Sequence, residues 1–264
     1  MTTTVGDQLT PTLSVVVPAC NEAANLPACV DALHATLAAS PYEVVVVDDG
    51  SRDDTAAVAA RLAAAQPDRV RLLRHDHNQG LGAALRTGFA AARGDYVTCC
   101  PADFITSPDD WAPFAAALGK ADVIVGCRVR REGYNPLMRC NAWLYPRLVR
   151  LLFGLRLRDV NWISVYRRAL VDRVTITQRG IPMLAEILVK LRDQGATFVE
   201  VDCRMQPRRT GTPSASRPRV MVRTLHGLFQ FWWSYRRPET ASTPAAAPVS
   251  TPASAPADPA RPRS

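Results

Sequence analysis

Short apolar runs rich in β-branched residues alternate with Ala/Leu-rich stretches over the first hundred residues, and this alternation constrains the fold more than any other feature. It predicts strands at residues 13–17, 42–47, 70–74 and 96–100, with helices at 21–37, 51–65 and 82–93 between them. Strands that are apolar throughout and separated by helices are typical of a parallel sheet with both faces covered. The sequence therefore predicts an α/β fold with a mostly parallel sheet and helices on both faces.

The second half of the chain continues this pattern less regularly. It predicts helices at 111–118, 141–153, 183–194 and 220–235, and strands at 121–125, 158–166 and 197–201. We expect a flexible N-terminus at 1–12 and a single domain at 13–237. The stretch 238–264 is mostly Pro, Ala, Ser and Thr and holds seven of the 21 prolines. It is predicted to be a disordered tail, because it offers too little apolar surface to offset the entropy of ordering it.

The net charge of +8 is concentrated in two arginine-rich stretches. Residues 128–158 contain eight arginines and one acid, and residues 204–237 contain eight arginines and no acid. Such stretches can be a solvated basic surface, or they can bind the phosphates of a nucleotide, a lipid headgroup or a membrane. A nucleic-acid partner is not expected, because no helix-turn-helix, zinc-finger or RNA-binding pattern accompanies the charge.

The seven cysteines show no paired spacing, and residues 1–11 carry no signal-peptide pattern. Both features favour the reducing cytoplasm. No apolar run approaches the roughly 18 residues that suggest a membrane-spanning helix. The sequence therefore predicts a cytoplasmic protein that is soluble or peripheral at the inner face of the membrane.

Polar residues follow three of the predicted strands. They are Pro-Ala-Cys-Asn-Glu at 18–22, Asp-Asp-Gly-Ser at 48–51 and Pro-Ala-Asp at 101–103. Ligands of open parallel sheets bind where such strand ends converge, and acids there can contact a base or ribose or hold a divalent cation. Each motif alone also suits a turn or a helix start, and Ser51 with Asp54 predicts a capping box. The order and spacing of the three motifs together favour a binding crevice.

The motifs in this order resemble the family 2 glycosyltransferases, which have the GT-A fold. The resemblance rests on residues 15–22 (Val-Val-Val-Pro-Ala-Cys-Asn-Glu), 45–51 (Val-Val-Val-Asp-Asp-Gly-Ser), 78–80 (Asn-Gln-Gly) and 94–97 (Gly-Asp-Tyr-Val). Gly-Cys-Arg at 126–128, Asp159 before Tyr-Arg-Arg at 166–168, Glu186, and Pro-Arg-Arg-Thr-Gly at 207–211 resemble the branch around dolichol-phosphate mannose synthase. The resemblance implies inverting transfer of a sugar from a nucleotide-diphosphate donor, a GDP- or UDP-sugar, to a polyprenyl phosphate or related small acceptor.

The resemblance also implies roles for individual residues. Those expected to bind the nucleotide sugar are Pro18, Cys20 and Glu22 around base and ribose, Val47 and Asp49 beneath the base, Ala102 and Asp103 in the Asp-x-Asp position, and Arg128 and Arg208 at a phosphate. Asp103 is also expected to be catalytic, by holding Mg²⁺ or Mn²⁺ against the diphosphate. Arginine suits a phosphate because its guanidinium gives bidentate contacts.

The chain departs from the family pattern at the expected metal site. Pro101 replaces the first acid of Asp-x-Asp, Phe104 and Ile105 follow it, and Ser214 replaces an expected basic residue. The segment 159–164 also lacks the branch's usual glycine-containing turn. Three consequences stay open: Asp103 holds the metal with diphosphate and water, arginines partly replace the metal, or catalysis is lost. In the last case the chain would be a nucleotide-sugar-binding pseudoenzyme or interaction module.

Two further predictions concern the acceptor side. An acceptor hydroxyl needs a general base, for which Asp159 and Glu186 are the candidates, although both could be structural partners of arginines. An acceptor phosphate needs little base catalysis. The apolar helix with interspersed arginines at 143–155 fits either the protein core or a membrane interface.

Overall fold

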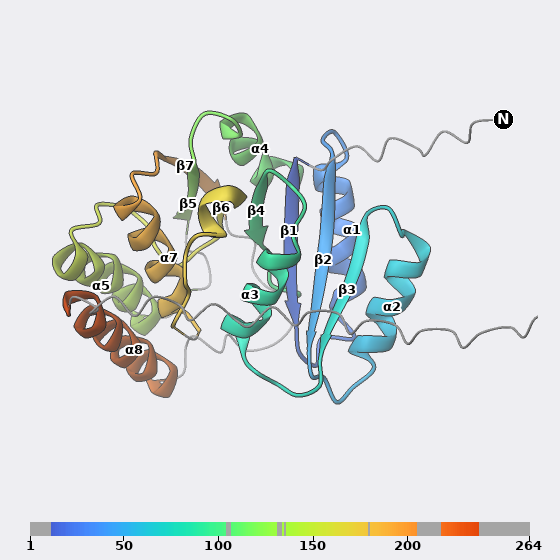
Figure 1. Cartoon of the computed structure of the whole chain (residues 1–264), viewed down its shortest axis with the longest axis horizontal. Coiled ribbons are helices and arrows are strands. Elements are labelled where there is room, and N and C mark those ends of the chain that lie inside the picture. Colours follow the sequence, from blue (N-terminus) through green and yellow to red (C-terminus); the bar gives the residue numbers. More distant parts are fainter. Residues whose placement is uncertain are drawn as a thin grey trace, which may run out of the picture.

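The computed structural model describes residues 12–103, 107–130, 134, 136–178, 180–204 and 218–237. The described residues form one mixed sheet with helices packed against both of its faces (Figure 1). Residues 1–11 of the predicted flexible segment 1–12, the tail 238–264, Arg208 and Ser214 lie outside these residues.

Seven strands form the sheet, in the order β3-β2-β1-β4-β6-β5-β7. They are β1 (Leu13–Ala19), β2 (Tyr42–Asp49), β3 (Val70–His75), β4 (Tyr96–Cys99), β5 (Val123–Arg130), β6 (Ser164–Arg167) and β7 (Phe198–Arg204). Only β6 among these strands is antiparallel to its neighbours, β4 and β5. The prediction of a mostly parallel sheet is confirmed.

Eight helices accompany the strands in the described part of the chain. They are α1 (Leu26–Leu37), α2 (Thr55–Ala65), α3 (Leu81–Ala91), α4 (Pro108–Ala117), α5 (Pro136–Phe153), α6 (Arg168–Val171), α7 (Pro182–Asp193) and α8 (Pro218–Arg236). Successive strand residues face opposite sides. Val16 and Val45 therefore pack with α3, α5, α7 and α8, while Val15 and Val44 pack with α1, α2 and α4. Helices on both faces are thus confirmed.

The first two helices begin later than the sequence predicts. Helix α1 starts at Leu26, not at Asn21, with a proline in its first turn. The predicted capping box of Ser51 and Asp54 is wrong: the Asp53 carboxylate accepts the Thr55 amide at 3.0 Å, while the Ser51 hydroxyl accepts the Asn21 amide at 3.0 Å. Residues expected to start helices instead join two loops to each other.

The strand predicted at 158–166 is also shorter than expected. Strand β6 covers only Ser164–Arg167. Asp159 and Asn161 precede it and contact the side chain of Arg128. Polar contacts of this segment, and not sheet pairing, therefore fix the chain before β6.

No described helix is both long enough and apolar enough to cross a bilayer.

Candidate functional site

The strand directions bring the carboxyl ends of six strands to one edge of the sheet. Strands β1, β2, β3, β4, β5 and β7 run the same way, so their carboxyl ends share this edge. We call it the donor edge, because the sequence resemblance predicts that a nucleotide-sugar donor binds there. The segment before β6 also reaches it, because β6 runs the opposite way. The donor edge therefore receives the loops that carry Glu22, Asp103 and Asp159, as well as Asp49 and Arg128 on the strands themselves.

The loops after β1 and β2 are joined by backbone and side-chain hydrogen bonds. The side chain of Asn21 accepts the Arg52 amide at 2.9 Å, and the Glu22 amide donates to the Thr55 hydroxyl at 2.8 Å. Asn21 has φ 58, a left-handed conformation that asparagine tolerates better than most residues. The Glu22 carboxylate accepts Asn25 Nδ2 at 2.7 Å. These contacts fix Glu22 beside the end of β2.

Asp49 holds the loop before α3 against the donor edge. Its carboxylate accepts the amides of Gln79 at 2.9 Å and Gly80 at 2.8 Å, and lies 2.7 Å from His75 Nδ1. Burial, the largest single effect, raises the pKa of Asp49, but the bonds from Gln79, His75 and Gly80 together hold that pKa below its ordinary value. Asp49 is therefore an ionised, almost fully enclosed acceptor at this edge.

Glycine at position 50 permits the close approach of that loop. Gly50 has φ +64, and a Cβ there would lie 2.3 Å from the carbonyl carbon of His77. Asn78, the next residue, donates from Nδ2 to the Cys20 sulfur at 3.0 Å. The β1, β2 and β3 ends thus converge on Cys20 and Asp49.

Pro18 and Val47 are cross-strand partners near the same edge. Pro18 is half-buried, whereas Val47 is fully buried and packs with α3. Val47 therefore supports the edge from within the core and presents no surface to a ligand.

The turn after β4 carries the expected metal ligand. The Pro101 carbonyl oxygen lies 3.7 Å from the sulfurs of both Cys29 and Cys100, so it is directed into the protein. Ala102 is buried and Asp103 is half-buried. Magnesium sites commonly use one or two carboxylates together with substrate phosphates and water. Asp103 fits such a site with a bound diphosphate, and the described residues contain no group of three side chains that could hold a metal unaided.

Arg128 forms a buried ion pair with Asp159. Its Nε and one terminal nitrogen donate to the two carboxylate oxygens at 2.7 and 2.8 Å, and both side chains are almost fully enclosed. Arg128 also donates to the Tyr134 hydroxyl at 2.8 Å, and its guanidinium lies 4.8 Å from the ring centre of Trp162. Most of its donors are therefore engaged within the protein, and Arg208 lies outside the described residues.

Glu186 is fully buried in α7. Its carboxylate accepts the amides of Thr177 and Gln178 at 3.0 and 2.7 Å, and the ammonium of Lys190 at 2.8 Å. A carboxylate with these partners and no solvent access holds the 177–178 segment against α7. This geometry favours the structural alternative for Glu186 over a role as a general base.

Sequence reasoning missed several residues of the donor edge. His75 bridges Asp49 and Thr87, lying 2.9 Å from the Thr87 hydroxyl through Nε2. Tyr134 and Asn161 complete the Arg128 cluster. His75 ends β3, so the strand-end rule that selected Asp49 could have found it. No local pattern marks Tyr134 or Asn161.

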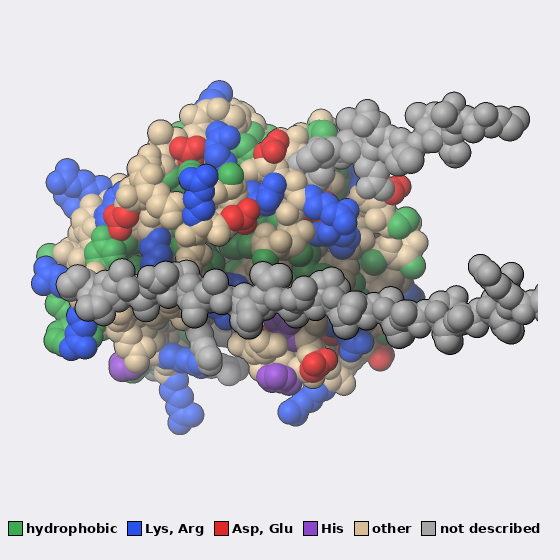
Figure 2. Space-filling view, viewed as in Figure 1, with side chains coloured by type: hydrophobic (Ala, Val, Ile, Leu, Met, Phe, Trp, Pro, Cys, Tyr) green, Lys and Arg blue, Asp and Glu red, His purple; other side chains and the backbone are tan. Residues whose placement is uncertain are grey.

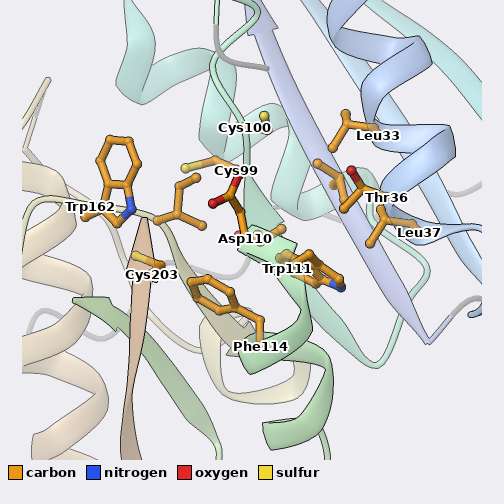
Figure 3. Close-up of a pocket in the computed structure, with 13 residues that line it drawn as sticks. Leu33, Thr36, Leu37, Cys99, Cys100, Asp110, Trp111, Phe114, Trp162 and Cys203 are labelled. Atoms are coloured by element: carbon orange, nitrogen blue, oxygen red, sulfur yellow. The ribbon is translucent and has the colours of Figure 1, made fainter. Parts of the chain in front are cut away.

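An apolar cavity lies next to Cys99 and Cys100 (Figure 3). It has a volume of about 30 Å³ and lies between Trp111, Phe114 and Trp162. This volume suffices for about one water molecule. The cavity is therefore a packing void, too small to hold a nucleotide sugar.

Residues 14–175 match the family model described as glycosyl transferase family 2. The chain is 30% identical to a polyprenol monophosphomannose synthase of Mycolicibacterium smegmatis, over 76% of this chain and 80% of that protein. It is 29% identical to a dolichol-phosphate mannosyltransferase of Pyrococcus furiosus, over 67% of this chain and 52% of that protein. The chain spans about half the length of several other curated relatives it matches.

Among solved structures, the fold is similar to glucosyl-3-phosphoglycerate synthase of Mycobacterium tuberculosis in complex with Mn²⁺ and UDP. The TM-score is 0.65 at 21% identity, over 83% of this chain and 79% of that one. This similarity shows a common fold of the GT-A type. Together with the family match and the two curated relatives, it establishes that the chain belongs to glycosyl transferase family 2, in the branch that contains dolichol-phosphate mannose synthase.

Proposed function

We propose that this chain is an inverting glycosyltransferase that moves a sugar from a GDP- or UDP-sugar to a polyprenyl phosphate or related small acceptor. The observation that carries the proposal is the convergence of three loops on the donor edge. There Asn21 is bonded to the loop after β2, Asn78 to Cys20, and Asp49 to the amides before α3. Such an edge offers a fixed surface for a nucleotide.

Cys20, Glu22 and Pro18 would contact the base and ribose. Asp49 would act from beneath the base, and Asp103 would lie toward the diphosphate. In this proposal, Arg208 is the basic residue that contacts a phosphate. Arg128 is held in its buried pair with Asp159. It would therefore act on the diphosphate mainly through its positive charge, and less through direct contact with a phosphate oxygen.

The engaged carboxylates favour an ionised acceptor. Asp159 is paired with Arg128 and Glu186 with Lys190, so neither is placed to remove a proton from a hydroxyl. A phosphate oxygen is already anionic at neutral pH and needs no base. This chemistry supports a polyprenyl phosphate over an acceptor alcohol.

In the proposed reaction, an acceptor phosphate oxygen forms a bond to the anomeric carbon from the face opposite the diphosphate. The bond between that carbon and the diphosphate oxygen breaks, and the nucleoside diphosphate leaves with the electron pair. Asp103 would hold Mg²⁺ or Mn²⁺, which when bound neutralises charge on the diphosphate. The relative of similar fold was solved with Mn²⁺ and UDP, which supports this choice of metal.

The proposed acceptor is a lipid, so the reaction would take place at the inner face of a membrane, with the protein in peripheral contact. Nucleic acid has no place in this function.

The decisive experiment combines the full chain with GDP- and UDP-sugars, Mn²⁺ and a short-chain polyprenyl phosphate. We expect nucleoside diphosphate release together with a sugar-phosphate lipid, and inverted configuration at the anomeric carbon. Asp103→Asn should lose turnover, whereas Asp109→Asn, on the first turn of α4, should retain it. An Asp103→Asn variant with near-full activity would remove Asp103 from the mechanism.

The second candidate function is a nucleotide-sugar-binding module without catalysis. Pro101 favours it, because the family's first acid is missing at that position. Thermal shift together with the turnover assay separates the two, since a ligand that binds the folded state raises the melting temperature whether or not it is turned over. Stabilisation by a nucleotide sugar without turnover on any acceptor tested would favour the module.

A further inference from the structure

Side chains from three elements form a chain of close polar contacts at the donor edge. His75, the last residue of β3, is paired across the sheet with Asp49, the last residue of β2. Its Nδ1 lies 2.7 Å from the Asp49 carboxylate, and its Nε2 lies 2.9 Å from the hydroxyl of Thr87 on α3. Both nitrogens of the imidazole are therefore engaged, and the ring connects α3 to the end of β2.

Close packing of α3 on the sheet brings Thr87 to this position. The next residue, Gly88, lies against Val16 of β1, and a Cβ at Gly88 would stand 2.2 Å from Val16 Cγ1. A larger residue at position 88 would push α3 away from the sheet, because the interior is already close-packed. The contact between Thr87 and His75 therefore depends on the small residue that follows Thr87.

The charge of Asp49 decides which nitrogen of His75 donates to it. Burial, the largest single effect, raises the pKa of Asp49, but the hydrogen bonds from Gln79, His75 and Gly80 together hold that pKa below its ordinary value. An ionised carboxylate accepts and cannot donate, so Nδ1 must carry the hydrogen of this contact. In the neutral ring Nε2 is then an acceptor, and the Thr87 hydroxyl donates to it. Thr87 therefore supports the tautomer and the ring orientation in which His75 donates to Asp49.

The same carboxylate fixes the loop 77–80. Asp49 accepts the amides of Gln79 and Gly80 at 2.9 and 2.8 Å, and Gly80 is the N-cap of α3. The side chains of His75 and Asp49 are only 8% and 5% exposed, so water has little access to replace a lost bond between them. If the imidazole turned away, the carboxylate would lose one of its three donors and would be less firmly directed at the two amides.

The outer side of this loop is open to a ligand. Figure 2 shows histidine side chains among acidic and basic ones at the lower edge of the molecule, where β1, β2 and β3 end in Figure 1. His75 is nearly enclosed, whereas His77 and Asn78 are exposed. Asn78 donates to the Cys20 sulfur at 3.0 Å, so the loop reaches across to the end of β1. The enclosed histidine therefore supports an exposed loop from within the protein.

We propose that His75 is a positioning residue for nucleotide binding, and that Thr87 holds its imidazole in the orientation that serves this role. His75 does not touch the nucleotide. It acts through Asp49, by keeping the carboxylate directed at the amides of the loop 77–80, against which the base and ribose lie. The inference rests on the proposed function and deepens it, because it makes the affinity for the donor depend on a side chain of α3.

Two substitutions at position 75 separate positioning from packing. His75→Asn places its amide nitrogen where Nδ1 lies and keeps the donor to Asp49, whereas His75→Gln places its amide nitrogen near Nε2 and loses that donor. Glutamine is closer to histidine in volume, so a role in packing alone predicts that His75→Gln is the better tolerated variant. We expect the reverse: the Kd for UDP or GDP should rise about three- to tenfold in His75→Gln, and stay within about twofold of the parent in His75→Asn.

Calorimetric titration of the full chain with UDP and GDP in the presence of Mn²⁺ measures these constants. His226→Ala, which removes an exposed histidine of α8, is the matched control and should bind like the parent. In the transfer assay, His75→Gln should raise the KM for the donor and leave kcat unchanged, because only binding is affected. Circular dichroism establishes that each variant is folded.

Thr87 and the tautomer are tested separately. Thr87→Val keeps the shape of the side chain but removes the hydroxyl, and should raise the Kd for the nucleotide about two- to threefold, whereas Thr87→Ser should restore it. Nitrogen NMR shifts of the imidazole show which nitrogen carries the proton, and the chain has only four histidines to assign. We expect the parent to carry a proton on Nδ1 of His75.

Equal nucleotide affinity of the parent, His75→Gln and Thr87→Val overturns the inference and leaves the proposed function intact. A His75 ring protonated on Nε2 alone also overturns it, because Nδ1 then has no hydrogen to donate to Asp49. Better binding by His75→Gln than by His75→Asn would reduce the role to packing, and a fall in kcat at unchanged donor KM would assign His75 to the chemical step, so either result refutes positioning. A folded parent that binds neither UDP nor GDP overturns the proposed function itself, and the inference with it.

Discussion

Arg128 and Asp159 form a bidentate ion pair that is almost wholly enclosed at the donor edge, with N···O distances of 2.7 and 2.8 Å. The two residues are 31 positions apart in the sequence. Their pairing fixes the segment before β6 to the end of β5.

Asp159→Asn should therefore destabilise the protein strongly. Breaking a buried pair leaves an uncompensated charge, and the expected cost is about 3–5 kcal/mol. Asp202→Asn removes one of the two acidic partners of Arg158, in a pair that is more than half exposed, and should cost under about 1 kcal/mol. Urea unfolding of both variants measures the difference. Equal small losses would show that the Arg128 pair contributes little.

Asp49→Asn should lower the free energy of unfolding, and the loss should be larger at neutral pH than at acidic pH. The side-chain amide of asparagine accepts fewer hydrogen bonds than a carboxylate. A buried donor left without its acceptor costs roughly 1–3 kcal/mol. Because the pKa of Asp49 is lowered on folding, its stabilising effect is present above the ordinary value of 3.8 and is lost as the pH falls through the lowered pKa. The gap in unfolding free energy between parent and variant should narrow on acidification. A gap independent of pH would contradict this assignment.

Pro101→Asp should reduce the Mn²⁺ concentration needed for donor binding. The added carboxylate would join Asp103 in the turn after β4, and a second hard oxygen ligand strengthens a divalent site. Titrating Mn²⁺ at fixed donor concentration, followed by thermal shift, measures the effect. Pro101→Ala is the control for removing the ring alone. If the aspartate and alanine variants need the same metal concentration, the turn does not face the diphosphate.

A bound nucleotide should protect Cys20 from alkylation. Cys20 is half-buried at the donor edge, whereas burial raises the pKa of Cys99 to about 11 and of Cys127 to about 12, which makes those thiols poor nucleophiles. In a Cys140→Ser background, which removes the exposed thiol, maleimide labelling followed by mass spectrometry should report mainly Cys20. Labelling of Cys20 should slow at least severalfold with saturating GDP or UDP. An unchanged rate would place the nucleotide elsewhere.

Much of the sheet could be predicted from the sequence because its strands are apolar on both faces. Residues 13–17, 42–47 and 96–100 are each recognisable without knowledge of their partners, and the observed strands begin at the predicted residues. The limits of α1 and β6 could not be predicted, because they depend on contacts with distant segments. Asn21 bonds to Arg52, and Asn161 to Arg128.

The same reasoning explains the outcome at the site. Strand-end motifs indicated which loops would share an edge, and strand direction alone suffices for that inference. Strand direction does not predict which groups each carboxylate contacts. Asp49 receives amides from residues 30 and 31 positions away, and Glu186 is enclosed by a loop that no motif marks. Sequence motifs therefore located acids but could not separate those facing a ligand from those bonded within the protein.

Gly50 has a consequence for how a nucleotide would meet this protein. Because its missing side chain lets the 77–80 loop close over the end of β2, that loop is set in place by covalent geometry and internal bonds. The loop would therefore already have its bound conformation before a ligand arrives, and the protein would lose little conformational entropy on binding. We therefore expect nucleotide binding to be fast and to need little rearrangement of this loop.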